Sequence, residues 1–122
     1  MLTSKVFALS LLFVSVLASA KVQFDLRAAV KNSVLYGNRD ITVKFQIDEH
    51  ETLEVYHDNT LKIVAELLSE RDDAATICFT IYDHDTTIIA PVLIPNYVSP
   101  ATLSLGSSKG ESFTLVVNAQ KV

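Results

Sequence analysis

The sequence has a single cysteine, Cys78, among its 122 residues. Small secreted domains are commonly stabilised by disulfides, and a chain with one cysteine cannot form an internal bridge. The fold must therefore depend on core packing. Because Cys78 lies within an apolar, strand-like segment, we expect its thiol to be buried and unreactive.

Glycosylation sequons and catalytic motifs are also missing. No Asn-x-Ser/Thr occurs, since Asn32 directly precedes Ser33 and Asn59 directly precedes Thr60. With only three glycines, the chain has no phosphate-binding glycine loop, and neither G-x-S-x-G nor H-E-x-x-H is present. The acidic residues fall mostly in turns, which gives no cleft suited to the paired carboxylates of a glycosidase. We therefore expect a protein that is not an enzyme and that needs no cofactor.

Positive charge is scarce as well. The chain has 10 Lys and Arg against 14 Asp and Glu, a net charge of −4. Nucleic acids and anionic membrane surfaces both favour clustered Lys and Arg, so neither is expected as a partner. The acidity is typical of a soluble protein.

Residues 1–20 have the three parts of an export signal. Lys5 supplies a positive start, Val6 to Leu17 is apolar, and Ala18 to Ala20 is a small-residue cleavage site before Lys21. The apolar run is too short to span a bilayer core of about 30 Å as a helix. An uncleaved membrane anchor is the alternative. The absence of cysteine at the cleavage point argues against bacterial lipoprotein processing.

Cleavage would leave residues 21–122, one domain with nine Lys and Arg against fourteen Asp and Glu and a net charge of −5. An exported domain with neither disulfides nor sequons is typical of a bacterial periplasmic or secreted protein. The expected localisation is therefore the periplasm or the exterior.

Apolar residues recur at every second position throughout this domain, which predicts strands with one buried face. Turn-forming residues separate the strands, as in Tyr36-Gly37-Asn38, Asp83-His84-Asp85 and the stretch from Gly106 to Gly110. Short strands at this spacing predict an all-β, single-domain antiparallel β-sandwich of seven or eight strands. The alternating series are centred on Val22–Val30, Val43–Ile47, Leu53–Val55, Leu61–Ile63, Ile77–Ile81 and Phe113–Val117.

Residues 60–71 are ambiguous between strand and helix. Leu61, Val64, Ala65 and Leu68 would share one helical face, with Asn59-Thr60 as a cap. The alternation of the preceding segment continues through residues 60–67, however, and favours a strand.

The two halves of the domain resemble each other. Thr52 to Val55 matches Thr102 to Leu105, and Leu61 to Val64 matches Phe113 to Val116. Phe24, Leu26 and Ala28 likewise match Ile77, Phe79 and Ile81, with offsets of 50 to 53. This echo predicts two pseudo-repeated four-strand halves, although any two sets of alternating strands align to some extent.

All three prolines lie between Ala90 and Pro100. Proline within a strand confines it to a sheet edge or a bulge. This segment is therefore predicted to be an edge strand that is protected from pairing with other chains.

Each histidine lies in an acidic turn, and up-and-down counting of strands places His57 and His84 at one end of the sandwich and His50 at the other. His57 and His84, with Asp58, Asp83 or Asp85, could supply nitrogen and oxygen ligands for zinc or copper. The alternative is that these are ordinary solvated turn residues.

The tyrosines Tyr56 and Tyr82 flank the same two turns. Tyrosine rings favour protein contacts when exposed, and otherwise cover the edge of a core. This end of the sandwich is the predicted binding face, and it consists of Tyr56, His57, Asp58, Tyr82, Asp83, His84 and Asp85.

The sequence thus predicts an exported, non-catalytic binding or accessory module that contacts another protein through loops at one end of a β-sandwich. A periplasmic zinc- or copper-binding protein that uses His57 and His84 is one alternative. A structural subunit that assembles by edge-strand addition is the other.

Overall fold

The computed structural model describes residues 21–33, 37–106 and 112–122, and these form nine strands and no helix. The sequence predicted seven or eight strands, and the strand that it did not predict is β6, which has only four residues. The strands are β1 (Lys21–Ser33), β2 (Gly37–Asp48), β3 (Thr52–His57), β4 (Leu61–Glu70), β5 (Ala75–Asp83), β6 (Thr86–Ile89), β7 (Val92–Leu93), β8 (Ala101–Gly106) and β9 (Ser112–Lys121).

Three sequence predictions fall on residues outside the described ranges. They are the export signal at residues 1–20, the start of the turn at Tyr36, and the turn that follows Gly106. Within the described ranges, no helix has the length and apolar character needed to cross a membrane.

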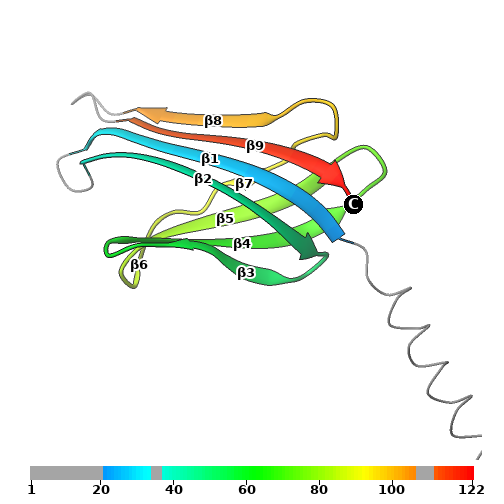
Figure 1. Cartoon of the computed structure of the whole chain (residues 1–122), viewed down its shortest axis with the longest axis horizontal. Coiled ribbons are helices and arrows are strands. Elements are labelled where there is room, and N and C mark those ends of the chain that lie inside the picture. Colours follow the sequence, from blue (N-terminus) through cyan, green and yellow to red (C-terminus); the bar gives the residue numbers. More distant parts are fainter. Residues whose placement is uncertain (1–20, 34–36, 107–111) are drawn as a thin grey trace, which may run out of the picture.

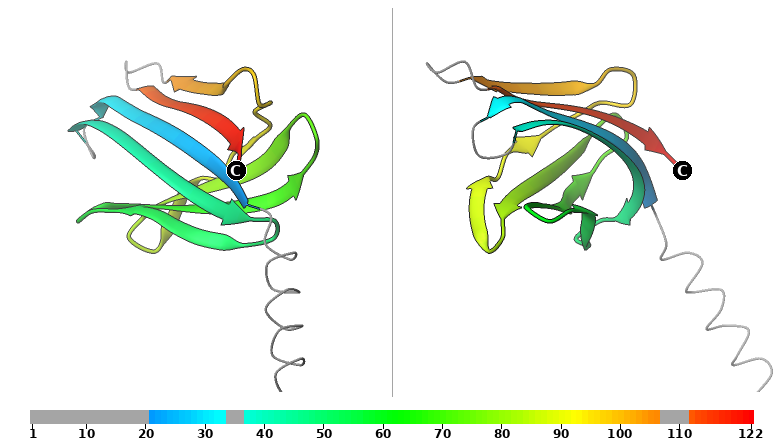
Figure 2. Two further views of the ribbon diagram at one scale, coloured as in Figure 1. Left: turned by 45° about the vertical axis from the view of Figure 1, so that its right-hand side comes forward. Right: turned by 60° about the vertical axis from the view of Figure 1, so that its left-hand side comes forward.

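The strands form two antiparallel sheets that pack face to face (Figures 1 and 2). One sheet has the order β2-β1-β9-β8, and the other has the order β3-β4-β5-β6, with β7 also paired to β5. Five of the pairs join strands adjacent in sequence, namely β1–β2, β3–β4, β4–β5, β5–β6 and β8–β9. The chain changes sheet between β2 and β3 and between β7 and β8, and β1 pairs with β9, the last strand. The predicted antiparallel β-sandwich is confirmed.

The core forms where the inward-facing residues of both sheets meet. Along β5 the residues alternate between fully buried and partly exposed, as expected for a strand with one face in the core. Phe24, Phe45 and Phe79 link the layers, since the Phe45 ring stacks on Phe24 at 5.5 Å and meets Phe79 edge-on at 6.2 Å between centroids. This aromatic contact fixes the spacing of the sheets without any disulfide.

Residues 61–70 are a strand, which resolves the ambiguity in the sequence. Leu61, Ile63, Ala65 and Leu67 are each at most 1% exposed, whereas Val64, between them, is only partly buried. This period of two is incompatible with the helical face considered above. Tertiary pairing with β3 and β5 selects the strand.

The two halves have equivalent connections. The hairpin β1–β2 belongs to one sheet and β3–β4 to the other, while β5–β6 and β8–β9 occupy the sheets in the reverse order. Strands β1, β2, β3 and β4 of the first half therefore correspond to β5, β6, β8 and β9 of the second half, each in the opposite sheet. The central pair β1–β9 of one sheet accordingly corresponds to the central pair β5–β4 of the other.

The register of these central pairs follows the sequence echo. Leu26 lies opposite Val117, and its counterpart Phe79 lies opposite Ala65, the counterpart of Val117. The outer strands agree less well, because Thr102 pairs with Val116, two residues from the position that the echo predicts. Strand order and central register are thus consistent with pseudo-repeated halves.

Two local predictions meet different outcomes. The proline-containing segment is an edge strand as predicted, since β7 pairs only with β5 and is flanked by Pro91 and Pro95. Cys78, in contrast, is only partly buried. It occupies an outward-facing position between the buried Ile77 and Phe79, so the expectation of a buried thiol was wrong.

Candidate functional site

The turn between β3 and β4 is built on the carboxylate of Asp58. Asp58 Oδ1 accepts hydrogen bonds from the backbone N–H groups of Thr60 and Leu61, each at 2.8 Å. The Asp58 N–H donates to the Leu61 carbonyl oxygen at 2.9 Å. One side chain therefore satisfies the donors of a tight turn, which is the usual role of aspartate in such positions.

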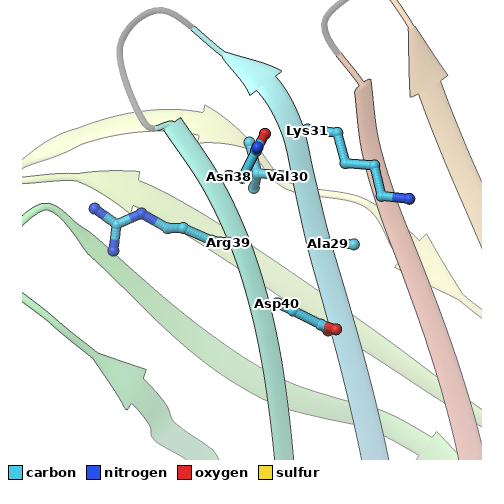
Figure 3. Close-up of a pocket in the computed structure, with 6 residues that line it drawn as sticks. All are labelled: Ala29, Val30, Lys31, Asn38, Arg39 and Asp40. Atoms are coloured by element: carbon cyan, nitrogen blue, oxygen red, sulfur yellow. The ribbon is translucent and has the colours of Figure 1, made fainter.

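The second oxygen of Asp58 links this turn to the opposite sheet. Oδ2 accepts a hydrogen bond from the Tyr56 hydroxyl at 2.6 Å and forms an ion pair with the Arg39 guanidinium. Arg39 belongs to β2, and Figure 3 shows it extending toward the other sheet, away from Lys31 and Asp40. The Arg39–Asp58 pair thus fastens the two sheets together at the edge where β2 and β3 lie.

These contacts decide the charge of Asp58. Partial burial alone would raise the pKa of its carboxyl. The hydrogen bonds from Leu61, Tyr56 and Thr60, and the positive charge of Arg39, outweigh that effect and lower the pKa from 3.8 to about 2. The same hydrogen bond, together with burial, raises the pKa of the Tyr56 hydroxyl above its usual value of 10.0. Asp58 is therefore an anion and Tyr56 a neutral donor at neutral pH.

A bulge in β3 turns the Tyr56 side chain inward, so that its hydroxyl can reach Asp58. Glu54 lies opposite Val64 and Tyr56 lies opposite Ile63, so Val55 is an extra residue with no partner of its own on β4. The insertion reverses the alternation, and Tyr56 faces the core side although Thr52 and Glu54 face outward.

The second turn carries His84 and is joined to the first. The His84 N–H donates to the Thr60 carbonyl oxygen at 3.2 Å. His84 has a φ of 55°, the left-handed conformation, and its Nδ1 lies 2.7 Å from Asp83 Oδ1. The two turns therefore form one unit at the left-hand end of the sandwich in Figure 1.

An open depression of about 330 Å³ lies between these turns. Among its lining residues Leu61 has the one apolar side chain. Glu54 and Asp85 are exposed and form no salt bridge within the described part of the chain, although Lys62 lines the same depression. The lining residues are Glu54, His57, Asp58, Asn59, Thr60, Leu61, Lys62, His84 and Asp85.

The structure brings four of the seven predicted site residues to this depression, namely His57, Asp58, His84 and Asp85. Asp83 lies beside it as the partner of His84. His50 occupies the turn at the opposite end of β3, as strand counting predicted.

The two predicted tyrosines do not line the depression. Tyr56 points toward the core and Asp58, and its ring packs against the core cluster. Tyr82 lies on the outer side of β5 beneath Lys62, whose Nζ is 4.9 Å from the ring centroid. Both rings support the turns, one from within and one from outside, instead of presenting a free face.

A metal site at this end lacks a complete set of ligands. Across residues 21–33, 37–106 and 112–122, no group of three or more His, Cys, Asp or Glu side chains has a geometry that could hold a metal ion. Since Nδ1 of His84 is engaged by Asp83, only Nε2 of that ring faces outward for coordination. Two imidazoles without a third ligand make a weak site.

A second depression, of about 290 Å³, lies over the ends of β1 and β2 (Figure 3). It is lined by Ala29, Val30, Lys31, Asn38, Arg39 and Asp40. It shares Arg39 with the ion pair described above, so the two depressions lie on either side of one structural contact.

No protein-family model, curated protein or solved structure matches this chain, so its function has to be argued from its own residues and geometry.

Proposed function

We propose that this protein is an exported, non-catalytic binding module that contacts another protein through the joined turns at His57 and His84. The observation that carries the proposal is the network around Asp58. It holds one turn through two backbone hydrogen bonds and ties it to the other sheet through Arg39. A turn fixed in this way presents its exposed side chains with little loss of conformational entropy on binding.

The chemistry of the depression favours a protein partner over a small molecule. Small-molecule sites are mostly apolar and enclose most of the ligand. Here the lining is polar and the depression is open, with three carboxylates, two imidazoles and one lysine around it. The complementary surface would offer hydrogen-bond donors and positive charge to Glu54 and Asp85.

Site-specific photo-crosslinking tests this function. A photoreactive residue at Asn59, which lines the depression, is expected to form a covalent adduct with the partner when the protein is in its native compartment. The matched control is the same residue at His50, an exposed position with a left-handed φ of 67° in the acidic turn at the opposite end. Adducts of equal yield at both ends, or none at Asn59, would contradict the proposal.

Two variants define the surface further. His84→Ala and Asp85→Ala remove exposed side chains and should reduce the Asn59 adduct at least about tenfold, the effect of losing about 1.4 kcal/mol of binding energy. Glu49→Ala, at the far end, should leave the adduct yield unchanged.

Export is tested separately. The proposal requires that the protein isolated from its host begin at Lys21, directly after the small-residue site at Ala18 to Ala20. A protein that retains residues 1–20 and stays with the membrane would support the alternative of an uncleaved anchor.

A further inference from the structure

One continuous run of the sandwich contributes no charged side chain of its own. No Asp, Glu, Lys, Arg or His occurs from Thr86 to Ser108. The described part of this run forms β6, β7, the segment that crosses between the sheets, and β8. It follows the yellow-to-orange part of the chain in Figures 1 and 2, where the edge of each sheet is exposed. Among the described residues, Glu70 and Lys121 reach this run from outside it, and both contact Tyr97.

The same run carries most of the exposed large apolar side chains. Among the described residues, five large apolar side chains are exposed, and four of them belong to this run. The fifth is the terminal Val122. Depletion of charge around exposed apolar side chains is the compositional mark of an interface core. The four are Val92 at 53%, Ile94 at 64%, Val98 at 94% and Leu105 at 43% exposure.

The sheet edges differ in how well they are protected against pairing with another chain. Edge strands are commonly protected by charges, bulges or prolines. In β2, Arg39 points inward and Lys44 is exposed. In β3, the bulge at Val55 interrupts the ladder, and the β6–β7 edge contains Pro91 and a register shift.

The β8 edge has none of these devices. Its six residues pair with β9 without a register shift, and they include neither a charged residue nor a proline. In the described part of the chain, no strand pairs with its outer side. Alternate residues of β8 therefore direct backbone N–H and C=O groups into solvent.

We propose that β8 is the interface between two copies of this chain, which pair antiparallel about a twofold axis normal to the sheet. A second copy fits because the edge is uncharged. The chain has a net charge of −4, and none of its charged residues belongs to β8, so pairing at this edge places no charged side chain of β8 against another. The two four-stranded sheets become one continuous sheet of eight strands.

The sequence of β8 is complementary to itself in this arrangement. Residues directly opposite each other in an antiparallel pair point to the same face of the sheet. In a pair of identical strands, opposite residues must therefore be an even number of positions apart. One residue then lies opposite its own copy, with the twofold axis between them. With the axis at Ser104, Leu103 meets Leu105 of the second copy. With the axis at Leu103, Thr102 meets Ser104 of the second copy. Either register places leucines together on the inner face and hydroxyls together on the outer face.

The pairing of β8 with β8 of a second copy limits assembly to two copies. An isologous contact uses the same patch on both copies and stops at a dimer. Edge-to-edge filaments, the basis of the structural-subunit alternative, would need a second unprotected edge. The other edges carry the charges, bulges and prolines described above.

Analytical ultracentrifugation of the mature chain over a wide concentration range tests the dimer. The wild type is expected to reach twice the monomer mass as its concentration rises. Ser104→Lys places two ammonium groups near the axis and should raise the dissociation constant at least about tenfold. Thr42→Lys is the matched control, since Thr42 is an exposed, outward-facing residue on β2, the other edge of the same sheet. It should leave the constant unchanged.

Disulfide trapping identifies the edge involved. In a Cys78→Ser background, Thr102→Cys with Ser104→Cys should give a covalent dimer in either register, because opposite Cβ atoms lie about 4.5–5.5 Å apart. The control pair Thr42→Cys with Lys44→Cys on β2 should stay monomeric. A wild type that is monomeric up to about 1 mM, or covalent dimers formed only by the β2 pair, would overturn the proposal. Neither result would affect crosslinking from Asn59, which tests the loop end.

Discussion

Replacing Asp58 by asparagine should reduce stability in a manner that depends on pH. The variant keeps a carbonyl oxygen for the N–H groups of Thr60 and Leu61 but loses the negative charge that faces Arg39 and Tyr56. The fall in pKa from 3.8 to about 2 corresponds to about 2 kcal/mol at ~1.36 kcal/mol per unit. Because the Asp58 side chain is 21% exposed, screening by solvent reduces the expected loss to about 1–2 kcal/mol at pH 7.

The sign of the pH dependence follows from the lowered pKa. A carboxyl whose pKa is lower in the folded state stabilises the fold above its unfolded pKa of 3.8. This contribution is lost as the pH falls through about 2, where the carboxyl becomes neutral and resembles asparagine. The difference between wild type and Asp58→Asn should therefore shrink between about pH 4 and pH 2.

Urea unfolding followed by far-ultraviolet circular dichroism measures this difference at pH 7, 4 and 2. Asp85→Asn is the matched control, because Asp85 lies in the neighbouring turn, is exposed and forms no salt bridge within the described residues. It should change the free energy of unfolding by less than about 0.5 kcal/mol. Equal effects of the two variants at pH 7, or a difference from wild type that persists undiminished at pH 2, would refute the reasoning.

Three further perturbations address the core, the ion pair and the histidines. Phe79→Ala should cost about 3–5 kcal/mol in urea unfolding, since the ring is fully buried at the centre of both sheets, and a loss below 1 kcal/mol would contradict this packing. Arg39→Met should raise the pKa of the Asp58 carboxyl from about 2 toward 3.8, as followed by nuclear magnetic resonance titration; because the hydrogen bonds remain, a full return to 3.8 is not expected. Zinc titration by calorimetry should give the same weak response for wild type and for His57→Ala with His84→Ala, whereas micromolar binding lost in the double variant would establish the metal site.

The strands could be predicted because each has one buried face. Period-two alternation identifies a strand wherever the core covers only one side of it. This alternation is why a strand was correctly predicted over residues 61–70, although the segment could also be read as an amphipathic helix. The sequence echo predicted two similar halves but not which strands pair, and the register of the central strands is consistent with that echo. Their buried residues, such as Leu26 and Phe79, must interdigitate and so keep a fixed register.

The candidate site was predicted only in part. Turn residues revealed His57, Asp58, His84 and Asp85, because the number of strands between two turns decides which end of the sandwich they share. The orientation of Tyr56 could not be predicted, since a single extra residue, Val55, reverses the alternation without leaving any compositional signal. Bulges are decided by pairing with the neighbouring strand, and that information is not local.

Arg39 was missed although the sequence contains a signal for it. It begins the inward-facing series that continues through Ile41, Val43 and Phe45. A guanidinium on the apolar side of a strand requires an anionic partner. That partner, Asp58, belongs to the other sheet, and the sequence does not show which carboxylate across the sandwich meets it.

The pairing of β1 with β9 bears on when this protein can fold. Val22 lies opposite Lys121, so the first strand obtains one of its two neighbours only from the last residues of the chain. Hairpins such as β3–β4 and β4–β5 bring together nearby residues and can form early, but closure of the first sheet requires a loop of nearly the whole domain. When the N-terminus emerges first, the sheet that contains β1 and β9 therefore stays incomplete until the last residues of β9 are available. Under the export proposed above, the first sheet would stay incomplete while the chain crosses the membrane, because β1 and β9 could not yet pair.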